Sequence, residues 1–137
     1  MVTPNKQSVS EIEAAIKGFG EAYATGDLDR FLGFCADDIV AMPPGMPPVV
    51  GMADWKNMIA GMFASSDRSD VVLISKDITV VGDWAIEWHV EAATSTNKET
   101  GESKRNYNKG IWVFRRDDGR WKLARYCWNP TPEVEPQ

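Results

Sequence analysis

The stretch DWAIEWHVEAATS, residues 83–95, alternates apolar and polar side chains with the two-residue period of a β-strand. One face carries Trp84, Ile86, Trp88, Val90 and Ala92, and the other carries Ala85, Glu87, His89 and Glu91. Such a strand needs partners on both sides and a cover for one of its faces. This segment therefore predicts a sheet in the second half of the chain.

The segments on either side of this strand predict its neighbours. DVVLISKDITVVG (70–82) is a strand that can contain a bulge, and KRNYNKGIWVFRR (104–116) and RWKLARYCWN (120–129) are two more. The polar loop TNKETGES (96–103) and the tight turn DDG (117–119) join them, with Gly119 where a positive φ is needed. We expect an antiparallel meander.

The first half of the chain has helical periodicity. Ser8 or Ser10 can cap a first helix, because a Glu stands three residues after each, and Gly26 ends that helix. The apolar face of this helix consists of Ile12, Ile16, Phe19 and Tyr23. Asp27 can cap a short second helix that carries Leu28, Phe31, Leu32 and Cys35. A third helix over 53–64 has the stripe Trp55, Met58, Ile59, Met62 and Phe63.

A short strand, DDIVAM (37–42), and a proline-rich loop lie between the second and third helices. We interpret Asp37 and Asp38 as turn residues that open the strand. The loop contains four prolines, which fix φ and remove backbone donors, so it can be rigid without strand pairing. We expect it to form a wall or lip of a cavity.

Composition limits the classes of protein. A chain of 137 residues with 43% hydrophobic residues and six Trp fits one domain, residues 1–137, with its core in about 8–129. The net charge of −5 argues against binding to nucleic acid or to anionic membranes. Neither an apolar leader nor a membrane-spanning run is present, which predicts a cytoplasmic protein. The two Cys and single His form no metal-binding motif, so neither a metal nor a cofactor is expected.

The pieces together resemble a known family. FGEAYATGDLDRFLGFCADDIVAMPPGMPPVVGMADW (19–55), GDWAIEWHV (82–90) and GIWVFRRDDGRWKLARYCWN (110–129) resemble the SnoaL-like and ketosteroid-isomerase-like proteins of the nuclear-transport-factor-2-like superfamily. The resemblance implies an α+β fold in which a cone-shaped, curved, antiparallel or mixed sheet wraps around three N-terminal helices. It also implies an apolar pocket at the open end, with MPPGMPPVVG (42–51) at its rim, and a homodimer paired through the sheet.

The catalytic residues of ketosteroid isomerase are missing. The resemblance places its general base at Pro43, its oxyanion tyrosine at Phe19 and its second acid near Ile111, and none of these side chains can do that chemistry. Cyclases of the superfamily also use an acid on the strand that contains Ile111. Steroid isomerisation is therefore rejected. Cyclase chemistry of that type is also not expected, because its acid is missing from this strand.

The remaining polar groups leave two arrangements open. If the apolar face of strand 83–95 packs inward, His89 and Glu87 are exposed to solvent or to a dimer partner, and the polar character of their face favours this. If the apolar face packs outward into a dimer, they line the cavity and become a base and its carboxylate. Tyr107 and Lys109 can bind a carboxylate or enolate oxygen, or lie at the cavity edge and in solvent.

We therefore predict a small-molecule-binding protein. Its candidate catalytic groups are His89, Glu87, Tyr107 and Lys109, and proton transfer or a lyase, isomerase or hydrolase step on a small, mostly apolar, carbonyl-type substrate is the candidate chemistry. The candidate ligand-binding residues are Phe19, Tyr23, Trp55, Met58, Ile59, Met62, Trp88, Tyr126, Trp128 and Asn129. The alternative is a non-catalytic module for ligand binding or dimerisation.

Overall fold

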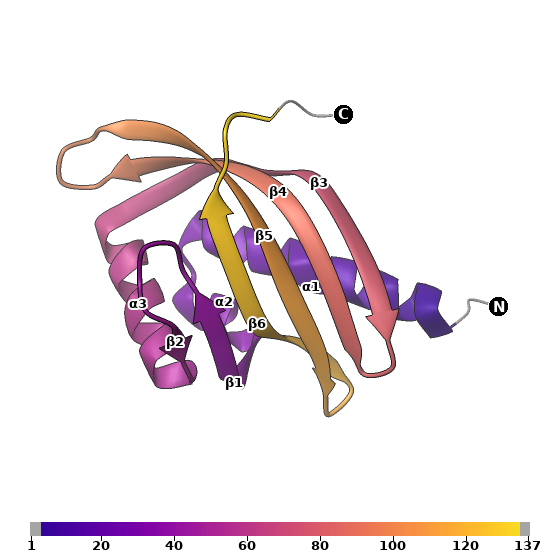
Figure 1. The fold of residues 1–137 in the computed structure, drawn as a ribbon. Coiled ribbons are helices and arrows are strands. Elements are labelled where there is room, and N and C mark those ends of the chain that lie inside the picture. The colour runs from indigo at the N-terminus through magenta and orange to yellow at the C-terminus, as the bar shows by residue number, and fades with distance from the viewer. Residues whose placement is uncertain (1–3, 135–137) are drawn as a thin grey trace.

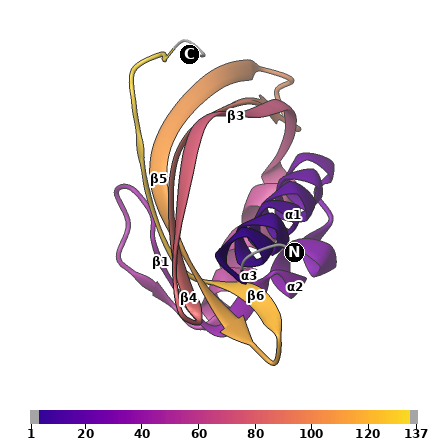
Figure 2. The same cartoon turned by 90° about the vertical axis from the view of Figure 1, so that its right-hand side faces the viewer.

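A six-stranded sheet curves around three helices, and all three helices lie on its inner side (Figures 1 and 2). The computed structural model describes residues 4–134. The elements are α1 (Pro4–Thr25), α2 (Leu28–Gly33), β1 (Cys35–Met42), β2 (Val49–Val50), α3 (Met52–Ser65), β3 (Ser66–Val81), β4 (Trp84–Asn97), β5 (Ser103–Asp117) and β6 (Arg120–Pro130). The predicted α+β class, with a curved sheet around N-terminal helices, is confirmed.

The sheet is mixed. Its strand order is β2-β1-β6-β5-β4-β3, and β3 to β6 form the predicted antiparallel meander. β1 extends it in parallel with β6. The predicted bulge in β3 is present, because its register with β4 shifts after Ser69 and again after Leu73. At the β5–β6 turn Asp118 and Gly119 have φ of 50° and 76°, the positive values that a tight two-residue hairpin requires.

Two predicted boundaries in the first half are wrong. α1 begins at Pro4 rather than after a cap at Ser8 or Ser10, and Ser8 is buried within the helix. Proline suits a first turn because its missing N–H would have no helical partner there. Cys35 belongs to β1 and not to the second helix, because the chain extends at this point to pair with Leu123 of β6.

The interpretation of Asp37 and Asp38 as turn residues is also wrong. Both belong to β1 and are exposed. The Asp38 carboxylate accepts two hydrogen bonds from the Arg115 guanidinium, at 2.8 and 3.0 Å. This ion pair ties β1 to β5 across the intervening strand β6. It lies on the outer side of the sheet, away from the helices.

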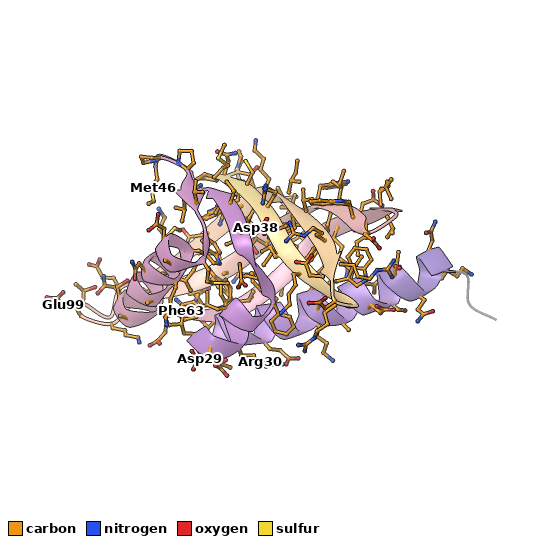
Figure 3. The ribbon with its side chains drawn as sticks, turned by 90° about the horizontal axis from the view of Figure 1, so that it is seen from below. Asp29, Arg30, Asp38, Met46, Phe63 and Glu99 are labelled. Carbon is orange, nitrogen blue, oxygen red and sulfur yellow. The ribbon has the colours of Figure 1, made fainter. Side chains whose placement is uncertain are left out.

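The proline-rich loop does not form a cavity wall. Val49 and Val50 pair with Ala41 and Val40 as β2, so the end of the loop is held by strand pairing as well as by its prolines. The rest projects on the side of the sheet away from the helices, where Met46 is half exposed (Figures 2 and 3). The loop leads from β1 to β2 and α3 at the edge of the sheet. It therefore stays on the outer side of the sheet and away from the helices.

The polar face of β4 packs inward, so the prediction that His89 is exposed is wrong. Glu87 and His89 are 0% and 1% exposed, whereas Trp84, Ile86 and Trp88 are 42–51% exposed on the outer face. The inner volume beside β4 is filled by aromatic and aliphatic side chains of α1, α2, β5 and β6. β4 therefore contributes the small Ala85, the paired Glu87 and His89, and Glu91 to this layer.

No helix within residues 4–134 is long and apolar enough to cross a membrane.

Candidate functional site

A cavity of about 90 Å³ lies between the helices and the inner face of the sheet. Its lining residues come from α1, α2, α3, β3, β4, β5 and β6: Ile16, Phe19, Gly20, Tyr23, Phe31, Trp55, Ile59, Met62, Val71, Leu73, Glu91, Asn108, Trp112, Tyr126 and Trp128. The lining is mainly aromatic and aliphatic, with a few polar groups, as small-molecule sites usually are.

Three rings from α3 and β6 form one wall of the cavity. The centroid of Trp55 lies 6.1 Å from that of Tyr126 and 6.4 Å from that of Trp128, and Tyr126 and Trp128 are 4.4 Å apart. On the opposite, α1 side, Phe19 stacks on Phe31 at 4.3 Å. These contacts hold the rings in place, so the shape of the wall is set before any ligand arrives.

Glu91 is the acid of the cavity. It lies on the inner face of β4 and pairs across the sheet with Asn108 of β5. Burial raises the pKa of Glu91, and the negative charge of Glu87 adds to the rise while His89 opposes it. Directly opposed residues of an antiparallel pair have Cβ atoms about 4.5–5.5 Å apart. The carboxyl of Glu91 and the amide of Asn108 can therefore contact the same ligand.

Two tyrosines share this polar end of the cavity. Burial, followed by the negative charge of Glu91, raises the pKa of Tyr23 to about 12 and that of Tyr126 well above its usual value. Both hydroxyls are consequently neutral at physiological pH and able to donate hydrogen bonds. Among the lining side chains of residues 4–134, none is a lysine or an arginine.

A buried pair lies next to the cavity but does not line it. His89 Nδ1 and Glu87 Oε1 are joined by a hydrogen bond of 2.7 Å, and both side chains are fully buried. The His89 ring lies 4.0 Å from the Trp112 ring, which separates it from the cavity. Within residues 4–134, His89 Nε2 and Glu87 Oε2 have no hydrogen-bond partner. Burial raises the pKa of Glu87, against the effect of the His89 hydrogen bond.

Gly110 allows the His89 ring to approach the backbone of β5 closely. A Cβ at position 110 would be 3.0 Å from His89 Nε2 and 3.0 Å from the carbonyl oxygen of Cys127. Neither atom can move away easily, because His89 is enclosed and Cys127 O belongs to the backbone of β6. The sequence around residue 110 is therefore constrained by the buried histidine.

The structure brings seven of the predicted ligand-binding residues together. Phe19, Tyr23, Trp55, Ile59, Met62, Tyr126 and Trp128 all line the cavity. Met58 packs against the core beside it. Trp88, Tyr107, Lys109 and Asn129 do not line it, because by alternation along β4, β5 and β6 they share the outer face with Ile111 and Cys127. Tyr107 Oη contacts Glu133 Oε1 at 3.4 Å instead.

Sequence reasoning did not select Glu91 and Asn108. Glu91 shares its strand face with Glu87 and His89, so the alternation of β4 contained the signal once the polar face was known to point inward. Asn108 likewise precedes the buried Trp112 by four residues, the spacing of side chains on one strand face. The missing information was which face of the sheet the helices cover.

A groove of about 400 Å³ lies beside the cavity, between α1 and β3. The groove and the cavity share four lining residues, Ile16, Gly20, Val71 and Leu73. Charged side chains of both signs, Glu13, Lys17, Glu21 and Lys76, line the rest of the groove. The cavity therefore adjoins the surface at this groove.

The curved sheet around helices and the aromatic cavity between them define a protein of the nuclear-transport-factor-2-like superfamily. The family model described as the SnoaL-like domain matches residues 16–124, and the chain belongs to this family. Among described residues no group of three or more His, Cys, Asp or Glu side chains could hold a metal ion. A search of curated protein sequences finds no match to this chain.

Solved structures with the same fold carry several different descriptions. A ketosteroid isomerase-like protein from Erwinia carotovora atroseptica is 26% identical, with a TM-score of 0.76 over 90% of this chain and 96% of that chain. A candidate dehydratase of the NTF2-like family from Streptomyces avermitilis is 21% identical, with a TM-score of 0.84 over 96% and 100%. A candidate aromatic ring hydroxylase from Novosphingobium aromaticivorans is 22% identical, with a TM-score of 0.80 over 93% and 91%. Identities this low establish the shared fold and leave the reaction to the site.

Proposed function

We propose that the protein binds a small, mostly apolar molecule in the cavity and that Glu91 exchanges a proton with that molecule. This proposal rests mainly on one observation: the carboxyl group of Glu91 lies in a lining that is otherwise aromatic, aliphatic or neutral. A carboxyl in such surroundings retains its proton to higher pH than in water, as the raised pKa of Glu91 indicates. Such a carboxyl can give its proton to a bound molecule or, once ionised, remove one.

The proposed chemistry is cofactor-independent proton transfer on a carbonyl-type substrate. Protonated Glu91 can donate a hydrogen bond to a developing oxyanion, and ionised Glu91 can remove a proton from the neighbouring carbon. The amide of Asn108 and the hydroxyls of Tyr23 and Tyr126 are further donors at the same end of the cavity. An isomerase, lyase or hydrolase step of this kind is consistent with the range of descriptions among the structural neighbours.

The alternative function is binding without turnover. It is favoured by the sealing of the His89–Glu87 pair behind Trp112, which leaves Glu91 as the one carboxyl that reaches the cavity among residues 4–134. Native mass spectrometry of the purified protein would identify a bound molecule. Incubation of that molecule with the wild type and with Glu91→Gln then separates the two functions, since turnover that stops in the variant while binding persists supports the enzyme.

The Glu91→Gln variant also gives a prediction that needs no ligand. A carboxyl with a raised folded-state pKa costs stability once pH exceeds its unfolded-state pKa, because the unfolded chain ionises first. We expect Glu91→Gln to be more stable than the wild type at pH 7 and equal to it near pH 3.5. Chemical denaturation at several pH values measures this. Equal stability at every pH would contradict a strained carboxyl in the cavity.

We also propose that the outer face of the sheet pairs with a second copy of the chain. Trp84, Ile86, Trp88 and Ile111, which we call the outer patch, are 42–51% exposed, and Trp88 and Ile111 are direct cross-strand partners. Exposed apolar clusters of this kind usually mark interaction sites. Asp77 lies on the β3 side of the patch and Arg125 on the β6 side. A two-fold axis parallel to the strands would bring each Asp77 toward the partner's β6 side, so the face is self-complementary.

Disruption of the outer patch tests the dimer. We expect Trp88→Glu to convert the protein into a monomer, because two carboxylates would then be buried in the interface. Val72→Glu is the matched control, since Val72 is 47% exposed on the edge strand β3 and lies outside the outer patch. Sedimentation velocity measures the mass of both variants. A monomeric wild type, or a Trp88→Glu variant that remains dimeric, would contradict the proposed interface.

The cytoplasmic location expected from the sequence stays a prediction.

A further inference from the structure

The lining of the cavity has a definite preference for charge. Seven of its residues are aromatic: Phe19, Tyr23, Phe31, Trp55, Trp112, Tyr126 and Trp128. The faces of aromatic rings carry partial negative charge and attract cations within about 6 Å of the ring centroid. Glu91 adds a carboxyl group, and no lysine or arginine of residues 4–134 lines the cavity; the nearest cation that contacts a lining ring is the buried Arg68, whose guanidinium lies 5.2 Å from the centroid of Tyr23 and outside the lining. The ring faces and the carboxyl group would therefore repel an anion, whereas they would attract a cation.

The wall formed by Trp55, Tyr126 and Trp128 strengthens this preference. Their planes are inclined to one another by 66°, 70° and 44°, so the three rings present differently oriented surfaces to the cavity. Cages of aromatic rings recognise quaternary ammonium groups, and the faces of such rings attract other ammonium ions as well. Tyr126 is also close enough to Glu91 for the carboxylate charge to affect its hydroxyl. The ring wall and the acid can therefore contact one cation at the same time.

We propose that the ligand of the cavity is a small organic amine, bound as its ammonium ion with the nitrogen against Glu91 and the apolar body among the aromatic rings. This inference rests on the proposed function of the cavity. When a neutral amine meets protonated Glu91, the proton leaves the carboxyl oxygen and forms a bond to nitrogen, which gives a carboxylate–ammonium pair. A carbonyl group in the same molecule would lie toward the amide of Asn108.

The size of the cavity limits the amine. About 90 Å³ is the room that roughly three water molecules take in the liquid, so an amine of the size of benzylamine also extends into the groove that shares Ile16, Gly20, Val71 and Leu73 with the cavity. Benzylamine, benzyl alcohol and benzoate share one ring and nearly one size, and they differ in charge. They are therefore suitable probes of the charge preference, in the absence of an identified ligand.

The experiment measures the binding of these three probes by calorimetry and tryptophan fluorescence at pH 7. We expect benzylamine to bind at least about tenfold more tightly than benzyl alcohol, and benzoate to bind most weakly. In Glu91→Gln, the amine is expected to lose this advantage while the alcohol binds as before. Met62→Trp, which fills the cavity from α3, is expected to weaken benzylamine and benzyl alcohol together, and its melting temperature shows whether it folds.

The outcomes separate this inference from the function on which it rests. If benzyl alcohol or benzoate binds as tightly as benzylamine, the amine inference is overturned while the cavity remains a ligand site. An amine preference that persists in Glu91→Gln also overturns it. If none of the three probes binds, both the inference and the proposed function fail.

Discussion

Replacement of His89 by alanine is expected to lower the free energy of unfolding by about 3–5 kcal/mol, because it leaves a buried carboxyl without its hydrogen-bond partner and removes a large buried side chain. His89 and Glu87 are fully buried and joined by a hydrogen bond of 2.7 Å. In the variant the Glu87 carboxyl would stay enclosed with no donor. The loss of the imidazole would also leave a cavity against Trp112 and Gly110. Urea denaturation measures the change.

A double variant shows whether the loss of stability in His89→Ala comes from the Glu87 carboxyl that is left without a partner. Glu87→Met combined with His89→Leu replaces the pair by apolar side chains of similar volume, and such replacements of buried pairs are often neutral. We expect the double variant to be more stable than His89→Ala. If both variants lose the same stability, the unpaired Glu87 carboxyl is not the cause of the loss in His89→Ala. Because His89 is the single histidine, its imidazole NMR signals report directly which ring nitrogen carries the proton.

Replacement of Trp55 by alanine is expected to cost about 3–5 kcal/mol, as for other large aromatic side chains removed from a core. Trp55 is 1% exposed and contacts the Phe31, Tyr126 and Trp128 rings. Its indole N–H donates a hydrogen bond to Cys35 Sγ at 3.4 Å, which ties α3 to the start of β1. The alanine variant loses these contacts and enlarges the cavity. Thermal and urea unfolding both measure the effect.

Trp128→Ala is the matched control for Trp55→Ala. Trp128 belongs to the same ring wall but is only partly buried at the end of β6. Its removal takes fewer contacts from the core, so the loss of stability is expected to be clearly smaller, while the cavity wall is opened in both variants. An equal loss in the two variants would contradict the view that Trp55 holds α3 against the sheet.

The sequence was sufficient to predict most elements of this fold. The helical spacing of Trp55, Met58, Ile59 and Met62 placed α3, and the two-residue period placed β4, β5 and β6 close to their observed bounds. Period and turn chemistry are local properties, so they can be recognised in one chain. The predicted start of α1 was wrong because Ser8 has the chemistry of a cap but lies within a helix that Pro4 already begins.

The candidate site was only half predictable. Aromatic residues on helix faces that must be buried were expected to line the cavity, and Phe19, Tyr23 and Trp55 do. Glu91 was not selected, and Tyr107 and Lys109 lie on the other face of the sheet. Alternation divides a strand into two faces but does not label them, and the rule that apolar faces turn inward fails where a sheet has a second apolar surface to cover.

The sequence by itself therefore determined the order of the helices and strands, the turns between them and the two sets of side chains along each strand, because these follow from local periodicity and backbone chemistry. Only the tertiary structure decided that Glu87, His89 and Glu91 face the helices and that Trp84, Ile86 and Trp88 face outward. The physical reason is that α1, α2, β5 and β6 already supply the large side chains of the core. The inner face of β4 was left for polar groups that pair with one another or border the cavity.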